Sequence, residues 1–184
     1  EKRSAIGGTW DLFKYPGIRS DSDMFTLGFS FKPWKERKAI ADGPSIMNYL
    51  KETVSEHELE KNINYNQSLI KAEWSTAKAI WKITLFNSIA NKEEIISCKF
   101  LFMCSGYYSY DKGYTPEFKG IENFNGSIVH PQKWSEEVDY DNKKVVIIGS
   151  GATAVTLVPE IAKKASEVTM LQRSPTYIVA YPDE

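Results

Sequence analysis

A turn of small residues carries the clearest chemistry in this sequence. An apolar run, Val145-Val146-Ile147-Ile148, leads directly into Gly149-Ser150-Gly151-Ala152-Thr153-Ala154-Val155. Gly149 permits a tight turn, Gly151 lets the backbone approach a pyrophosphate, and the small Ala154 allows helix and strand to meet closely. Amides at the start of the helix would then face the diphosphate. The pattern therefore indicates a dinucleotide site, with a merely tight structural turn as the alternative.

A second candidate group lies about twenty residues further on. Where an NAD site places an acidic residue for the ribose hydroxyls, this chain has Arg173 and Ser174. A guanidinium and a hydroxyl suit a 2′-phosphate, which favours NADPH over NADH. The alternative is that Arg173 is an ordinary solvated surface charge.

Regular elements must hold these groups in place. Residues 143–148 form an apolar run typical of a strand, residues 153–165 have the period of an amphipathic helix, and residues 167–172 form a second strand. Pro159 lies inside this helix and is expected to kink it. Together they predict a β-α-β unit.

The preceding residues predict a different arrangement. A helix is expected over residues 44–57, followed by strands at 68–74, 79–86 and 95–104 that form an antiparallel meander feeding a buried strand. Residues 1–34 and 107–142 are rich in Gly, Pro and aromatics and predict ordered loops.

Composition excludes several function classes. The 184 residues are 42% hydrophobic and carry 23 basic and 24 acidic residues, for a net charge of -1. No basic stripe favours nucleic acid, and no apolar run approaches the ~20 residues of a membrane span. A cytoplasmic protein is expected.

The two cysteines predict no redox site. Cys98 and Cys104 lie about 20 Å apart along extended chain, so we expect two buried thiols rather than a disulfide or a dithiol reductase.

Two longer motifs resemble a known family. The opening segment has Gly7-Gly8-Thr9-Trp10, then Tyr15-Pro16-Gly17, then Asp21, and a later segment has Phe124-x-Gly126-x-x-x-His130-x-x-x-Trp134. Both are similar to fingerprints of the Baeyer-Villiger and flavin-containing monooxygenases, and most similar to the ethionamide-activating and long-chain alkane oxygenases. N- and S-oxygenating members usually have Phe or Tyr where Trp134 stands, so Trp134 favours the Baeyer-Villiger type. Ser135 departs from the usual Pro or Asp.

The resemblance implies roles for individual residues. Glu1 would hold the FAD ribose, Leu69 would meet the adenine through its backbone, and Asp21 is the catalytic candidate, paired with an arginine beyond residue 184. The remaining flavin and nicotinamide positions would be Thr9, Trp10, Asp11, Leu12, Arg19 and Ser20. Simpler readings are that Glu1 is a terminal charge, Trp10 a core aromatic and Asp21 a helix cap. His130 is expected to couple domains rather than to transfer a proton.

The resemblance also implies the fold and the reaction. We expect an α/β fold with two incomplete Rossmann-like dinucleotide-binding domains: a partial FAD domain over residues 1–142 with a β-meander insertion, and the start of an NADPH domain over residues 143–184. The whole enzyme would use a flavin peroxide to insert one oxygen of O2 into a small-molecule ketone or to oxidise sulfur, without a metal. The alternatives are an N- or S-oxygenating flavin monooxygenase and a non-catalytic fragment that binds nucleotide. A chain that begins at Glu1 without the first glycine turn is expected to be a fragment that cannot hold FAD alone.

Overall fold

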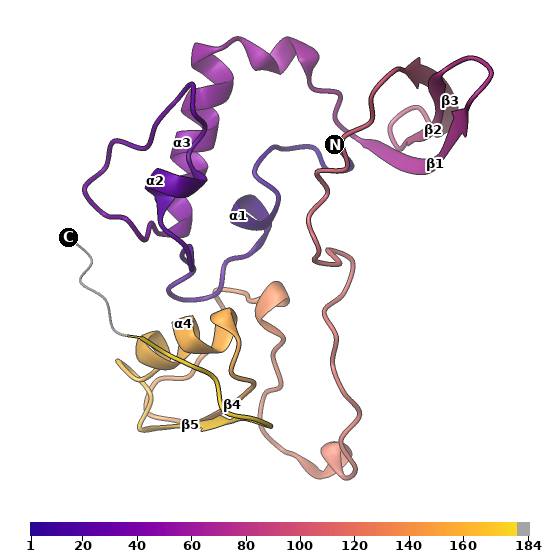
Figure 1. The fold of residues 1–184 in the computed structure, drawn as a ribbon. Coiled ribbons are helices and arrows are strands. Elements are labelled where there is room, and N and C mark those ends of the chain that lie inside the picture. The colour runs from indigo at the N-terminus through magenta and orange to yellow at the C-terminus, as the bar shows by residue number, and fades with distance from the viewer. Residues whose placement is uncertain (180–184) are drawn as a thin grey trace. The chain divides into compact units, whose positions relative to one another are not determined.

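A computed structural model describes residues 1–179 and shows a mixed α/β chain with two compact units (Figure 1). The first unit contains residues 1–8 and 51–108, and the second contains residues 9–50 and the chain from residue 109 onward. The expected fold class is confirmed. Each unit is built around a sheet of its own.

The first unit contains the predicted antiparallel meander. Its strands are β1 (Gln67–Ser75), β2 (Ile80–Asn87) and β3 (Lys92–Cys98), in the order β1-β2-β3. Trp74 pairs with Trp81 across the first hairpin, and their ring centroids lie 5.5 Å apart. Such cross-strand aromatic pairs stabilise a hairpin. The short 3₁₀ helix η1 (Leu59–Asn62) precedes these strands.

The third strand is shorter than expected. It ends at Cys98, and residues 99–104 have no regular structure. Phe100 and Phe102 are 77% and 82% exposed, so the prediction of a buried strand over residues 95–104 is wrong. Among the described residues no strand pairs with 99–104, and an apolar run without such a partner cannot form a ladder.

The prediction of two buried thiols is also wrong. Cys98 is half-buried at the end of β3, and Cys104 is exposed. Both are free, in agreement with the expected absence of a disulfide between them. Cys104 is exposed because it lies in the segment that has no pairing strand.

Helix α3 (Gly43–Glu56) matches the predicted helix within one or two residues. Asp42 begins it by accepting a hydrogen bond from the amide of Ser45 at 2.9 Å, a typical N-terminal cap. The buried faces of Ile46 and Tyr49 pack with Met24, Trp34 and Ala41 in one hydrophobic cluster. The segment expected to be a loop contains two single-turn helices, α1 (Thr9–Leu12) and α2 (Met24–Leu27).

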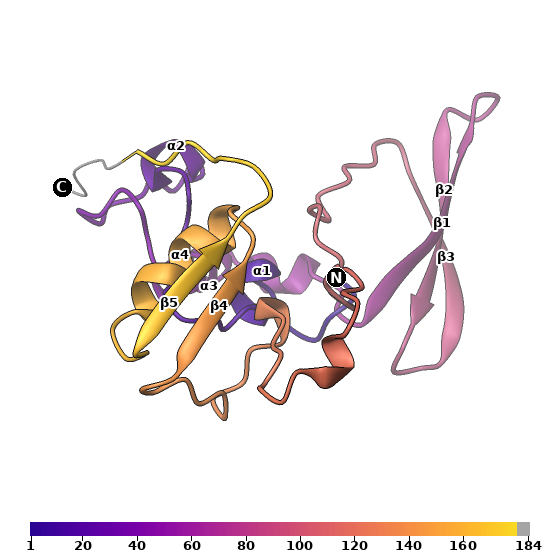
Figure 2. The same ribbon diagram turned by 90° about the horizontal axis from the view of Figure 1, so that it is seen from below.

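The second unit contains the predicted β-α-β element. Strands β4 (Lys144–Ile148) and β5 (Glu167–Leu171) are parallel, and helix α4 (Ala152–Ile161) lies against them (Figure 2). The helix ends at Ile161, not at residue 165, and Pro159 lies within it. The amide of Ala165 closes a tight turn on the carbonyl of Ile161 at 2.9 Å. This turn returns the chain to β5.

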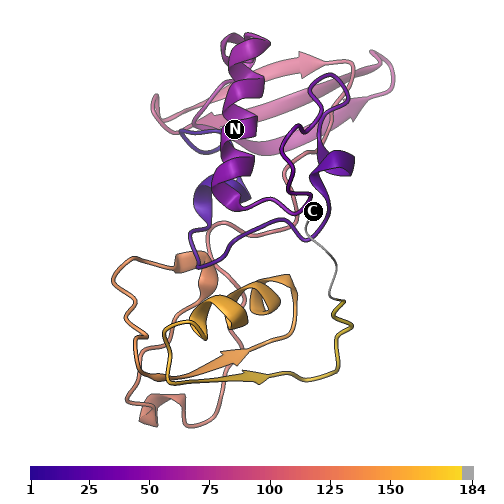
Figure 3. The same ribbon diagram turned by 90° about the vertical axis from the view of Figure 1, so that its left-hand side faces the viewer.

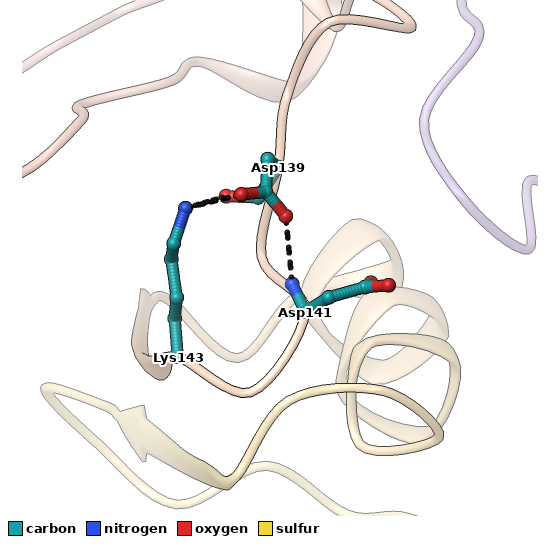
Figure 4. Close-up of polar contacts among 3 residues, drawn as sticks. All are labelled: Asp139, Asp141 and Lys143. Atoms are coloured by element: carbon teal, nitrogen blue, oxygen red, sulfur yellow. Dashed lines mark hydrogen bonds and ion pairs between the residues drawn. The ribbon is translucent and has the colours of Figure 1, made fainter.

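A short loop leads into β4 (Figure 4). The Asp139 carboxylate accepts hydrogen bonds from Lys143 Nζ and from the amide of Asp141. The Lys143 hydrogen bond is the main reason why the pKa of Asp139 is lowered. Two further 3₁₀ turns, η2 (Ile121–Asn123) and η3 (Pro131–Lys133), lie in the connection before it. No helix in residues 1–179 has the length and apolar character that a membrane crossing requires.

Candidate nucleotide-binding site

The two glycines of the turn after β4 differ in what they do. Gly149 has φ +128°, a conformation that side chains rarely adopt, and its amide donates to the carbonyl of Leu171 at 2.8 Å. Gly151 has an ordinary φ of -79°. A Cβ atom at either position would meet nothing within 4 Å. Glycine is therefore needed at position 149 for the positive φ of the backbone, whereas Gly151 leaves open space in front of the helix.

The start of α4 presents amides to that space. Gly151 is the N-cap residue and provides no side-chain cap, and the first helical bond runs from the amide of Val155 to the carbonyl of Gly151 at 3.1 Å. The amides of Ala152, Thr153 and Ala154 therefore have no acceptor within the helix. Ala154 is 6% exposed and packs inward, which fits its expected role where helix meets strand. Three such amides at a helix N-terminus attract an anion.

The chain after β5 forms the edge of the same turn. Thr176 Oγ1 donates to Ser150 Oγ at 2.8 Å. Arg173 and Ser174 are exposed between β5 and Thr176. Among residues 1–179, no carboxylate pairs with Arg173.

The Tyr-Pro-Gly segment docks on α4 (Figure 3). Phe13 and Tyr15 are buried in one cluster with Leu157 and Ile161 of the helix. Gly17 has φ +73°, and a Cβ atom there would lie 2.3 Å from Cγ of Glu160. Only glycine allows this segment to lie so close to the helix.

Tyr15 is buried beside α4. It is 8% exposed and lies in the same cluster as Leu157 and Ile161. Burial raises the pKa of Tyr15, the nearby Thr153 side chain opposes this rise, and the charge of Asp21 adds to it. The phenol is therefore protonated at neutral pH and can serve as a fixed hydrogen-bonding group.

The residues expected along the flavin lie in the same unit. Thr9 Oγ1 shares a 3.2 Å hydrogen bond with the hydroxyl of Tyr110. Trp10 and Leu12 pack against the two hydrophobic clusters, and Asp11 is half-buried. Packing therefore holds α1 in place.

The Arg19-Ser20-Asp21 stretch is anchored by its middle residue. Ser20 is 3% exposed, and its Oγ accepts from the amide of Ala41 at 3.1 Å. Arg19 and Asp21 are exposed on either side. Asp23, not Asp21, caps α2 by accepting from the amide of Thr26 at 2.8 Å. The reading of Asp21 as a helix cap is therefore wrong.

Glu1 and Leu69 both belong to the first unit. The Glu1 carbonyl accepts from the amide of Gln67 at 2.8 Å, which places the N-terminus at the start of β1. The Glu1 carboxylate is exposed and accepts from the amide of Arg3 at 2.9 Å. Leu69 is 43% exposed beside the register shift of β1. The structure thus joins these two residues in one unit.

The residues of the linker motif, Phe124 to Trp134, make local packing and capping contacts. Trp134 packs edge-on against Tyr140, with centroids 6.0 Å apart. His130 Nδ1 accepts from the amide of Gln132 at 3.2 Å and caps η3. Phe124 is 59% exposed and lies over Gly126, where a Cβ atom would sit 2.5 Å from its ring. His130 therefore has a structural role in capping η3, and its expected role in coupling domains stays a prediction.

The sequence patterns located the glycine turn but missed three residues around it. These residues, which contact α4 or the turn from distant or irregular segments, are Tyr15, Gly17 and Thr176. The Tyr-Pro-Gly motif was a usable signal for the first two. No pattern indicated Thr176. No group of three His, Cys, Asp or Glu side chains within residues 1–179 is placed to hold a metal ion.

Comparison with known proteins gives consistent matches. Residues 29–182 match the model of the FMO-like family, described as flavin-binding monooxygenase-like. FAD-containing monooxygenase EthA of Mycobacterium tuberculosis (strain CDC 1551 / Oshkosh) is 56% identical over 184 residues, which is 100% of this chain and 37% of that protein. The chain thus spans little more than a third of that relative.

Two solved structures share the fold. An oxidized steroid monooxygenase bound to NADP superposes with a TM-score of 0.77 and 30% identity, over 96% of this chain and 34% of that one. OTEMO in complex with FAD and NADP superposes with a TM-score of 0.73 and 29% identity, over 95% and 33%.

Proposed function

Because this chain belongs to the flavin-binding monooxygenase-like family, we propose that the whole protein is an FAD- and NADPH-dependent monooxygenase of the Baeyer-Villiger type. The observation that carries the proposal is the open helix start at Gly151, with Arg173 exposed in the chain that follows β5. The names of the relatives, which mention FAD and NADP, support the same cofactors here.

The glycine turn fits a dinucleotide diphosphate. The space in front of Gly151 and the three amides that follow it match an anion held at a helix N-terminus. We assign Gly149 to Val155 to the NADPH diphosphate, with Ser150 oriented by Thr176. Arg173 and Ser174 would hold the 2′-phosphate through charge-assisted hydrogen bonds.

The flavin site draws on the remaining predicted residues. We propose that Glu1 and Leu69 contact the adenosine part of FAD and that α1 lies along the flavin. Arg19 and Asp21 are exposed on either side of the anchored Ser20, which suits two groups that meet cofactors. We also propose that residues 1–142 belong to the FAD domain and residues 143–184 to the NADPH domain.

When bound, the two cofactors would supply hydride transfer and the activation of O2. The task of this chain is to bind and orient them. Asp21 would place a negative charge near the reacting centre and pair with a cation supplied by the rest of the protein. Helix α4 would fix the position of the nicotinamide nucleotide from its diphosphate end.

The Baeyer-Villiger assignment rests on Trp134, which packs with Tyr140 against the cluster that contains Phe13. The test is to incubate the full-length protein with NADPH, ¹⁸O₂ and either a ketone or a thioether. The proposal expects an ester that contains one labelled oxygen. Sulfoxide from the thioether without ester from the ketone would favour the other branch of the family. No NADPH-dependent product from any of these substrates would favour the non-catalytic alternative.

A further inference from the structure

A short segment on and after α2 exposes four large apolar side chains. Phe25 and Leu27 of α2 are 58% and 55% exposed. Phe29 and Phe31, in the turn that follows, are 42% and 59% exposed, and their rings stack with centroids 5.1 Å apart. We call residues 25–31 the aromatic loop. Exposed apolar side chains that gather in one place, rather than lying singly over a surface, mark a contact surface.

The fold holds the aromatic loop in a fixed shape. The hydroxyl of Tyr49, a buried residue of α3, accepts a hydrogen bond from the amide of Phe29 at 2.7 Å. The same hydroxyl donates to the carbonyl of Lys32 at 2.6 Å. The amide of Lys32 donates to the carbonyl of Phe29 at 3.0 Å and closes the turn. The exposed rings therefore belong to an ordered turn that is anchored to α3.

The backbone of the loop is bonded largely from within. The amide of Leu27 donates to the carbonyl of Asp23 at 3.1 Å. The amide of Gly28 donates to the carbonyl of Met24 at 2.8 Å. Backbone groups that already have hydrogen-bond partners can leave water at low cost, which is what entry into a lipid layer requires. A loop that added a strand to another protein would instead present unbonded amides and carbonyls.

Basic side chains follow the aromatic loop directly. Residues 32–38 contain four of them, and all but the first are exposed: Lys32, Lys35, Arg37 and Lys38. Glu36 is the one acidic residue between positions 25 and 38, so four basic residues and one acidic residue leave this segment with a charge of +3. The whole chain has a net charge of -1, so the positive charge is local. Basic groups beside an apolar anchor are attracted to the anionic headgroups of a membrane.

We propose that residues 25–38 form a docking surface for an anionic membrane. The exposed aromatic side chains enter the headgroup region, and the basic side chains contact the lipid phosphates. A shallow anchor of this kind holds a protein at a lipid surface without crossing the bilayer. The inference stands apart from the proposed function, because it needs neither cofactor.

Two other occupants would also explain the exposed rings. Another part of the full-length protein could cover the aromatic loop, and loss of the rings would then lower the melting temperature of that protein. A second copy of the chain could cover it, and loss of the rings would then dissociate a dimer. Neither of these predicts binding to vesicles that depends on the rings and on anionic lipid.

The experiment uses the full-length protein and phosphatidylcholine vesicles prepared with and without phosphatidylglycerol. We expect the protein to sediment with the phosphatidylglycerol vesicles and to be released by salt. Phe25→Ser combined with Phe31→Ser should weaken this binding at least about tenfold, because two rings no longer leave water. Ile89→Ser is the matched control, since Ile89 is 78% exposed in the turn between β2 and β3. The control should bind as the unmodified protein does.

A pair of lysine variants tests the charge and still decides the question if the phenylalanine variant does not fold. Lys35→Gln should weaken binding about fivefold, the effect of one basic group at an anionic surface. Lys78→Gln, at an exposed position between β1 and β2, should have no effect. Absence of binding by the unmodified protein would overturn the inference, whether or not the phenylalanine variant melts earlier or dissociates a dimer. Binding that survives loss of both rings, or equal effects of the two lysine variants, would overturn it as well.

Discussion

At the scale of single residues, the two glycines of the turn make different demands. Gly149 has a positive φ that the backbone requires, whereas Gly151 has a regular φ and open space where its side chain would be. The fold alone would accept a small side chain at Gly151. Glycine at that position is what the proposed NADPH diphosphate would require in order to approach the backbone.

This contrast gives a paired prediction. Gly149→Ala should lower the free energy of unfolding by about 1–3 kcal/mol through backbone strain. Gly151→Ala should leave stability within about 0.5 kcal/mol, as for a substitution into open space, but weaken NADP+ binding at least about tenfold. Thermal unfolding and NADP+ titration of both variants check this. A Gly151→Ala protein with full affinity would contradict the assigned site.

Ser20 makes a different prediction, because its buried hydroxyl is used inside the fold. Ser20→Ala leaves the amide of Ala41 without its side-chain acceptor and should cost about 1–3 kcal/mol of stability. Ser22→Ala, at an exposed position two residues away, is the control and should be neutral. Equal melting temperatures for the two variants would show that the Ser20 bond contributes nothing.

Tyr15 gives a prediction about pH. Its pKa in the folded protein is raised above the ordinary 10.0, so the stability that depends on its protonated form is fully present below pH 10.0. That stability is lost as the pH rises through the folded pKa, because the unfolded chain releases the proton first. The free energy of unfolding relative to that of Tyr15→Phe, measured by denaturant unfolding, should be constant from pH 7 to 9 and fall above about pH 10. A relative free energy of unfolding that rises at alkaline pH would contradict this prediction.

At the scale of elements, sequence periodicity predicted the helices and strands that depend on residues close together in the chain. Alternating and helical periods located β1, β2, α3 and the start of α4 within one or two residues. The run Phe100 to Cys104 misled the prediction, because an apolar sequence becomes a strand only if another strand pairs with it. Whether a segment finds a pairing strand depends on segments that are distant in the sequence.

The contact between the Tyr-Pro-Gly segment and α4 can be tested directly. Gly17→Ala introduces a Cβ atom at 2.3 Å from Glu160 Cγ and at a positive φ, so we expect a loss of about 1–3 kcal/mol. Gly17→Ala combined with Glu160→Ala should recover the steric part of this loss but not the backbone part. A double variant no more stable than Gly17→Ala alone would mean that Glu160 does not limit the approach.

At the scale of the whole molecule, sequence motifs predicted the family and the candidate nucleotide site, but not how remote segments meet. Tyr15 packs with Leu157 and Ile161 of α4, and the Thr9 hydroxyl shares a hydrogen bond with that of Tyr110. No sequence periodicity connects these distant segments. The glycine turn was predictable because strand, turn and helix are consecutive in the sequence. The roles of Glu1, Leu69, Arg19 and Asp21 at the cofactors stay predictions.

The central claim is that the start of α4 binds NADPH and that Arg173 recognises its 2′-phosphate. The most direct measurement is the ratio of the dissociation constants of NAD+ and NADP+ for the full-length protein, for Arg173→Ala, and for Lys164→Ala, which removes a charge beyond the other end of α4. Loss of a charge-assisted contact predicts that NADP+ affinity falls about 10- to 100-fold in Arg173→Ala while NAD+ affinity is unchanged. Equal affinities for NADP+ and NAD+ in the unmodified protein, or a preference for NADP+ that survives in Arg173→Ala, would contradict the account.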